Sequence, residues 1–111
     1  MNALKNKVQL IGNLGKDPEI INLESGKTLA KFTVATNENY KNAQGEKVTD
    51  TQWHNVIAWG KTAEIVEKYL TKGKEVAVEG KLTSRSYETK EGDKRYITEV
   101  VCNELLMLGG K

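Results

Sequence analysis

The sequence predicts an all-β fold: a small five-stranded barrel with one short helix between the third and fourth strands. Apolar and polar residues alternate over most of the chain with the two-residue period of β-strands. One segment after Gly60 switches to helical spacing, and Gly12 and Gly80 fall inside alternating segments, where a sheet can bend. The 111 residues are expected to form one domain, residues 1–111.

Three strands are expected in the first half of the chain, at about residues 5–14, 28–37 and 51–59. In the first, apolar residues alternate with polar ones until Asp17-Pro18 breaks the pattern. In the second, Ala30, Phe32 and Val34 share one face. The polar segment 39–50 contains Gly45 and is expected to be a long hairpin loop.

The second half is expected to hold one helix and a hairpin. Ala63, Val66 and Leu70 fall at helical spacing, Thr62 can cap the start, and Gly73 can stop the end. Strands at residues 75–87 and 95–108 follow, joined by a turn at 91–93. The inward positions of the first of these strands are Val76, Val78, Gly80 and Leu82. The resulting order, β-β-β-α-β-β, is that of the OB-fold.

The strand at 51–59 carries two tryptophans on the face that points away from the predicted core. Residue parity places Trp53, Asn55, Ile57 and Trp59 on one face, and His54, Val56 and Ala58 on the other. Large rings exposed together usually mark a binding surface. The alternative is that they pack under the long loop or against a second subunit.

Basic and aromatic residues interleave on the same predicted side. The outward positions of the fourth strand are Lys81, Thr83, Arg85 and Tyr87, and Tyr40 with Lys41 opens the long loop. Aromatic rings stack on nucleobases whatever the base, and Lys or Arg neutralises the phosphates between them. The pattern therefore predicts a surface for single-stranded nucleic acid.

Bulk properties limit the other classes of function. The net charge of +2 and pI near 8.6 are too mild to indicate a partner by themselves. No apolar window could span a bilayer, so no membrane association is expected. Residues 1–5 do not resemble a signal peptide and Cys102 has no disulfide partner, which indicates the cytoplasm.

The residues that could carry catalysis or bind a metal lack partners in the sequence. Gly60-Lys61-Thr62 echoes the end of a P-loop, but Asn55 stands where that motif needs glycine. His54 is expected to be hydrogen-bonded in the structure or at a subunit contact, and Cys102 to be buried. The carboxylates Asp17, Asp50 and Glu99 are expected on the solvated surface. We therefore predict no enzyme activity, no cofactor and no metal site.

The chain resembles the bacterial single-stranded DNA-binding protein family over nearly its whole length. The matching segments are residues 6–8, 12–19 (Gly-Asn-Leu-Gly-Lys-Asp-Pro-Glu), Trp53-His54, Gly60-Lys61 and 69–73. The resemblance implies an OB-fold, a homotetramer around which single-stranded DNA wraps, and protection of exposed strands in replication, recombination and repair. It also implies a cytoplasmic, nucleoid-associated protein.

The resemblance assigns roles to particular residues. The stacking aromatics are Tyr40, Trp53, Trp59 and Tyr87, and the phosphate-contacting bases are Lys7, Lys61, Lys72 and Arg85, to which the residue pattern adds Lys41. Asn55 and Ser86 stand where family members carry Arg and Lys, which reduces the expected phosphate contacts. The acidic C-terminal tail that recruits replication and repair proteins in the family is absent after Leu108-Gly109-Gly110-Lys111, so the chain is expected to be either a trimmed core or a tailless member.

The last strand has more apolar residues than one barrel face can bury, namely Ile97, Val100, Val101, Leu105, Leu106 and Met107. Self-association would use this surplus; alternatively, these residues cover one end of the barrel. Two other functions stay open on the residues alone: an OB module that mainly binds a protein partner, and a small carboxylate-dependent nuclease.

Overall fold

The computed structural model describes residues 5–108. Its elements are β1 (Val8–Leu14), β2 (Glu19–Asn22), β3 (Thr28–Lys41), β4 (Lys47–Trp59), α1 (Gly60–Tyr69), β5 (Glu75–Glu88) and β6 (Lys94–Met107). Residues 1–4 and 109–111, on which the expectations about a signal peptide and a tail rest, lie outside the described residues. Within the described range, the helix is too short and polar to cross a membrane.

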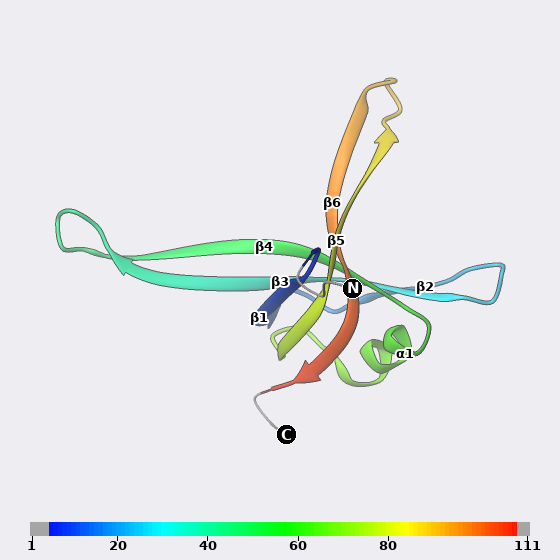
Figure 1. The fold of residues 1–111 in the computed structure, drawn as a ribbon, viewed down its shortest axis with the longest axis horizontal. Coiled ribbons are helices and arrows are strands. Elements are labelled where there is room, and N and C mark those ends of the chain that lie inside the picture. The colour runs from blue at the N-terminus through cyan, green and yellow to red at the C-terminus, as the bar shows by residue number, and fades with distance from the viewer. Residues whose placement is uncertain (1–4, 109–111) are drawn as a thin grey trace.

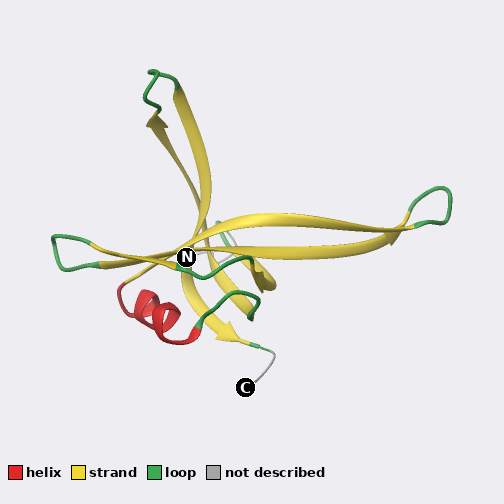
Figure 2. Ribbon diagram, turned by 180° about the vertical axis from the view of Figure 1, so that it is seen from behind, coloured by secondary structure: helices red, strands yellow, loops and turns green. Residues whose placement is uncertain are grey.

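Five of the strands close into a barrel, as predicted. Neighbours pair in the order β1-β5-β6-β4-β3, and β1 also pairs with β3, which closes the circle (Figures 1 and 2). All of these pairings are antiparallel except that of β4 with β6. The helix lies between β4 and β5, which are the third and fourth strands of the barrel. The OB-fold inferred from the element order is thus confirmed.

The sixth strand, β2, was not predicted. Its four residues pair with the first part of β3, from Glu19 opposite Lys31 to Asn22 opposite Thr28. A strand of this length right after Asp17-Pro18 has too few residues to show an alternating pattern. Its Ile20 side chain is partly buried and packs against the core.

The core is built from the alternating positions that the sequence indicated. Ala30, Phe32 and Val34 of β3 and Val56 and Ala58 of β4 are all buried. They meet residues of the other strands, of the helix and of its C-cap, which are Leu14, Ala63, Val66, Leu70, Val76, Val78, Val100 and Cys102.

The helix α1 packs its apolar side, with buried Ala63 and Val66, against the barrel, where it contacts β3, β4 and β6. The prediction that Thr62 caps it is wrong. The helix begins at Gly60 and its N-cap is Trp59, which makes no side-chain capping bond. Gly60 has a φ of 61°, a left-handed conformation that glycine adopts without strain, so β4 turns directly into the helix. Gly73, with a φ of 86°, lies in the turn that returns the chain to β5.

Gly12 and Gly80, predicted to lie where the sheet can bend, both lie where strands approach one another closely. A Cβ atom on Gly12 would lie 2.1 Å from the carbonyl oxygen of Ala35, where β1 meets β3. A Cβ atom on Gly80 would lie 2.0 Å from the carbonyl oxygen of Val101. The β5–β6 register shifts between Glu79 and Gly80, as at a β-bulge. The barrel therefore bends and closes at these two positions.

Two β-hairpin arms project from the barrel, and here two predictions are wrong. The β3–β4 pairing continues to Lys41 opposite Lys47, so most of the predicted long loop is strand (Figure 1). Neither face of this arm is buried and most of its residues are polar, so its sequence lacks the alternation that marks a half-buried strand. A tight turn closes it, in which the Asn42 side chain accepts hydrogen bonds from the backbone of Gln44 and Glu46.

The second arm extends β5 and β6 beyond the barrel. Leu82, predicted to point inward, is 48% exposed. Its parity is that of the buried Val76 and Val78, but past the bulge at Gly80 the strands leave the barrel.

Candidate functional site

The two tryptophans of β4 lie exposed on its outer face. Trp53 is 61% exposed and Trp59 is 42% exposed, whereas Val56 and Ala58 between them are buried. β4 is held between β3 and β6, so its backbone is fixed and its alternation sets where the rings point. The face predicted to be outward is therefore outward.

The Trp53 ring rests against the backbone of Gly15. A Cβ atom at Gly15 would lie 2.4 Å from Cζ3 of this ring and 3.0 Å from Oγ1 of Thr33. The Gly15 N–H donates to the Thr33 carbonyl oxygen at 3.2 Å, which holds the turn after β1 against β3. Gly15 thus supports one edge of the ring and leaves most of it in solvent.

A shallow pocket lies between this turn and the outer surface of β3 and β4. Its volume is about 190 Å³, and its lining residues are Lys16, Asp17, Glu19, Lys31, Phe32, Thr33 and Asn55. Lys16 and Lys31 bring positive charge to the pocket, and the carboxylates of Asp17 and Glu19 offset it. Asn55 contributes an uncharged amide to this pocket.

On the β3–β4 arm, the structure separates Tyr40 from the tryptophans. The cross-strand pairs that share the face of Trp53 are Ala35–Trp53, Asn37–Thr51, Asn39–Thr49 and Lys41–Lys47. Tyr40 pairs with Val48 on the opposite face and is 53% exposed. Lys41, in contrast, lies on the same face as Trp53. Tyr40 is therefore accessible, but on the other side of the ribbon.

On the β5–β6 arm, Arg85 and Tyr87 share one face, and Arg85 is paired with a carboxylate. Its Nε donates to Oε1 of Glu99 at 3.0 Å and its Nη2 donates to Oε2 at 3.2 Å. These hydrogen bonds, and then the charge of Glu99, raise the pKa of Arg85. Glu99 is only 4% exposed, so the expectation that it lies on the solvated surface is wrong. Burial of a carboxylate is costly without a partner, and the two-pronged guanidinium supplies one.

Lys7 is paired in a similar way. Its Nζ lies 2.7 Å from Oε2 of Glu79, and that hydrogen bond, followed by the Glu79 charge, raises the Lys7 pKa. Lys61 is exposed in the first turn of α1, and Lys72 is exposed in the turn after it. The Lys72 N–H donates to Oδ1 of Asp17 at 2.8 Å, which ties that turn to the segment between β1 and β2.

The nine predicted residues are therefore spread over several parts of the molecule. Trp53 and Lys41 lie on one face of the β3–β4 arm, Trp59 lies where β4 meets the helix, and Arg85 and Tyr87 lie on the second arm. The arms diverge from the barrel (Figure 2). A ligand that reached all of these residues would have to be long and flexible.

Sequence reasoning missed one exposed ring on the second arm. Tyr96 is 72% exposed and pairs with Ser86, so it lies on the face opposite Tyr87. The available signal was its place beside Arg95 in an alternating strand.

His54 and Cys102 take structural positions, as expected. Nε2 of His54 lies 3.0 Å from Oγ1 of Thr36 across the β3–β4 ladder. Cys102 is buried, and its Sγ donates to the carbonyl oxygen of Glu104 at 3.3 Å. Burial raises the pKa of the thiol to about 11. Among residues 5–108, His, Cys, Asp and Glu side chains form no group of three that could hold a metal ion.

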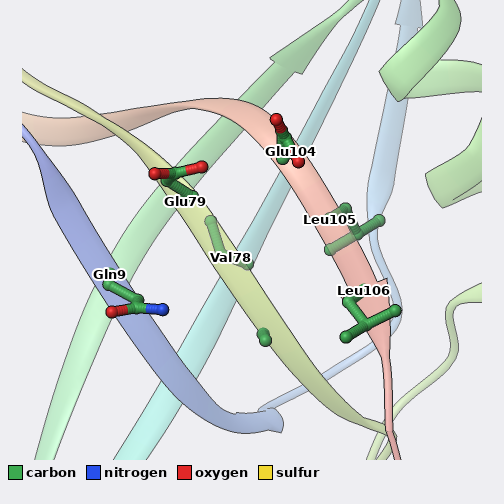
Figure 3. A pocket seen from close by; sticks show the side chains of 7 residues that line it. Gln9, Val78, Glu79, Glu104, Leu105 and Leu106 are labelled. Carbon is green, nitrogen blue, oxygen red and sulfur yellow. The ribbon is translucent and has the colours of Figure 1, made fainter. Parts of the chain in front are cut away.

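A hollow on another side of the barrel involves none of the nine predicted residues. It has a volume of about 280 Å³ and is lined by Gln9 of β1, Ala77, Val78 and Glu79 of β5, and Glu104, Leu105 and Leu106 of β6 (Figure 3). Exposed Leu106 and Ile11 flank Ala77 in register across these three strands.

Comparison with known proteins identifies the relatives of this chain. The model of the single-strand binding protein family matches residues 5–108. Single-stranded DNA-binding protein 1 of Chlorobaculum tepidum is 49% identical over 107 residues, covering 96% of this chain and 66% of the relative. The single-stranded DNA-binding protein of Neisseria meningitidis serogroup A is 44% identical over 106 residues, covering 96% and 61%. The chain thus spans less than two thirds of the length of these relatives.

A solved structure has the same fold. The Plasmodium falciparum SSB in complex with ssDNA superposes with a TM-score of 0.83 at 34% identity, covering 97% of this chain and 99% of that one.

Proposed function

Because this chain belongs to the single-strand binding protein family, we propose that it is not an enzyme but binds single-stranded DNA without reading its sequence. Bases stack on Tyr40, Trp53, Trp59 and Tyr87, while Lys7, Lys41, Lys61, Lys72 and Arg85 contact phosphates. The observation that carries the proposal is the pair of exposed tryptophans on the outer face of β4. Exposed rings favour flexible single strands, because a duplex has already stacked its bases internally.

The cationic residues contribute unequally in this proposal. Lys41, Lys61 and Lys72 are exposed and have no ion-pair partner among the described residues. Lys7 and Arg85 are each paired with a carboxylate, so part of their charge is already neutralised. With Asn55 and Ser86 uncharged as well, we expect a modest salt dependence, and stacking carries a larger share of the affinity.

We also propose that the protein forms a homotetramer, and that it protects exposed strands in the cytoplasm, at the nucleoid, during replication, recombination and repair. The row of exposed Ile11, half-buried Ala77 and exposed Leu106 across β1, β5 and β6 supports self-association, because a second copy would cover this apolar strip. Sedimentation equilibrium gives the mass of the assembly and tests this part of the proposal. The family and the solved complex of a relative with ssDNA support the cellular role.

The test of DNA binding is a titration with oligo(dT) that follows tryptophan fluorescence at two salt concentrations, with a duplex competitor. We expect strong quenching that salt weakens and the duplex does not compete away. Labelled oligo(dT) then compares Trp53→Phe with Trp53→Leu by fluorescence anisotropy. Leucine keeps apolar bulk but has no ring, so it should lose about 1–3 kcal/mol per stacked base, roughly 5- to 150-fold in Kd, and phenylalanine much less.

Two results would contradict the proposal. Absence of binding at low salt would exclude DNA as the ligand and favour a protein partner for the exposed rings. Equal binding by Trp53→Leu and the unchanged protein would show that Trp53 does not stack.

A further inference from the structure

A row of neutral polar side chains continues the face of Trp53 out along the β3–β4 arm. Asn37 pairs with Thr51, and Asn39 pairs with Thr49, on the same face as Trp53. Beyond them, Lys41 lies opposite Lys47 at the end of the arm. All of these side chains are exposed. We call the two Asn–Thr pairs the amide–hydroxyl ladder.

The ladder has a fixed hydrogen-bond direction. Oγ1 of Thr51 donates to Oδ1 of Asn37 at 2.7 Å, and Oγ1 of Thr49 donates to Oδ1 of Asn39, also at 2.7 Å. Each amide oxygen is therefore occupied by a threonine, whereas each amide NH₂ group keeps two donors. Within residues 5–108 neither of these nitrogens has a hydrogen-bond partner. The ladder thus presents N–H donors to a ligand.

The opposite face of the same arm has the contrary chemistry. Glu38 lies directly opposite Asp50, next to the pair formed by Thr36 and Gln52. Two facing carboxylates repel phosphate, whereas donors that end at two lysines attract it. The strand that leaves Trp53 is therefore expected to follow the donor-rich face, whereas Tyr40 on the acidic face would meet a different stretch of the DNA.

We propose that the amide–hydroxyl ladder binds phosphodiester oxygens of the DNA strand whose base stacks on Trp53, and guides that strand toward Lys41 and Lys47. This inference rests on the proposed DNA binding and adds Asn37, Asn39 and Lys47 to its site. Successive pairs on one strand face recur every 6–7 Å or so, so the ladder offers donors at a regular spacing along an extended strand. Asn37 and Asn39 contact phosphate without charge and therefore release no counterion.

The absence of charge makes the inference testable. The variant N37A/N39A should bind oligo(dT) more weakly by roughly two- to tenfold for each asparagine, with an unchanged slope of log K against log salt. K41A/K47A should instead flatten that slope by about 0.7 for each lost phosphate contact. N37A/N39A should lose the same factor on oligo(dA), because phosphates are common to both strands while adenine has no carbonyl oxygen.

Matched variants separate a direct contact from other effects. Gln52→Ala removes the same amide from the acidic face and should bind like the unchanged protein. Asn39→Asp and Gln52→Glu add one negative charge each to opposite faces, and only Asn39→Asp should bind much more weakly. T49V/T51V breaks the cross-strand bonds but keeps both asparagines, so it should retain most of the affinity.

The outcomes are distinct. If the unchanged protein does not bind oligo(dT), DNA binding and the ladder are both wrong. If it binds and N37A/N39A binds equally well, the ladder alone is wrong. A loss confined to oligo(dT) would overturn the phosphate assignment in favour of base carbonyl groups. An equal loss in T49V/T51V would show that the asparagines act only by ordering the arm.

Discussion

Gly12 and Gly15 lie three residues apart, and the same change to alanine should affect different properties of the protein. Neither glycine has a positive φ, so alanine can adopt both backbone conformations and the effect comes from contact alone. At Gly12 the new Cβ atom meets the backbone of Ala35, and at Gly15 it meets the Trp53 ring. The backbone of Ala35 cannot move aside, whereas the exposed Trp53 ring can.

Gly12→Ala should weaken the fold. Its Cβ atom would lie 2.1 Å from the Ala35 carbonyl oxygen, and β1 and β3 pair only at Asn13–Ala35 and Leu14–Val34, so separating them opens the barrel. Overpacking of this kind costs about 1–3 kcal/mol. Because the obstacle is backbone, we expect the upper end, a fall in Tm on the order of 10–20 °C.

Gly15→Ala should weaken DNA binding while leaving the fold stable. Its Cβ atom would lie 2.4 Å from Cζ3 of Trp53, and carbon atoms in contact stand about 3.5–4.0 Å apart. The ring must therefore retreat by more than about 1 Å, and it is exposed enough to do so at little cost. If the stacking geometry is lost, binding of oligo(dT) weakens by up to about 1–3 kcal/mol, which raises the Kd by at most roughly 150-fold.

The assays are thermal unfolding at fixed protein concentration, because any self-association makes Tm depend on it, and anisotropy with labelled oligo(dT). If the Tm of Gly15→Ala were as low as that of Gly12→Ala, the reasoning would be refuted, because the Trp53 ring would then be unable to move away from the new Cβ atom. Unchanged DNA affinity in Gly15→Ala would refute it as well, by showing that the position of Trp53 does not matter.

Two further predictions concern buried groups. Glu99→Gln removes the charge that neutralises Arg85, so we expect tighter binding of single-stranded DNA at low salt. The slope of log K against log salt should become steeper by about 0.7. An unchanged slope in a salt titration would argue against a phosphate contact by Arg85. Burial raises the pKa of Cys102 from 9.0 to about 11, so the thiol of the unfolded chain ionises at a lower pH than that of the folded protein. The contribution of this thiol to stability is therefore complete below about pH 9 and is lost as the pH rises toward 11. In urea unfolding over that pH range, the unchanged protein should lose stability faster than Cys102→Ala, and parallel losses would show that the thiol is not responsible.

The polar arm shows how alternation fails as a signal. Alternation marks a strand only where one of its faces is buried, as it is at Ala30, Phe32 and Val34, whose partners lie in the core. The arm from Asn37 to Lys41 has no buried face, so nothing in its hydropathy distinguishes strand from loop. Its backbone hydrogen bonds and the Asn–Thr pairs stabilise it as a strand, and both depend on the partner strand.

Leu82 and Glu99 show a second limit, which is that parity says nothing about where a barrel ends. Both residues follow the alternation of their strands, yet Leu82 is exposed and Glu99 is buried. The bulge at Gly80 and the departure of the arm leave Leu82 uncovered. Glu99 is tolerated because Arg85, fourteen residues away, meets it across the hairpin.

The sequence by itself determined the barrel, the place of the helix, the core faces of the strands and the outward position of Trp53 and Trp59. The core faces and the outward tryptophans follow from local periodicity, because a side chain on a strand has two directions and burial selects one of them. The barrel and the place of the helix follow from the order of the elements. Only the tertiary structure decided that Lys7 and Arg85 are paired with carboxylates, that Tyr40 lies on the opposite face from Trp53, and that Gly15 supports the ring. These depend on register and on contacts between distant segments, which no local pattern specifies.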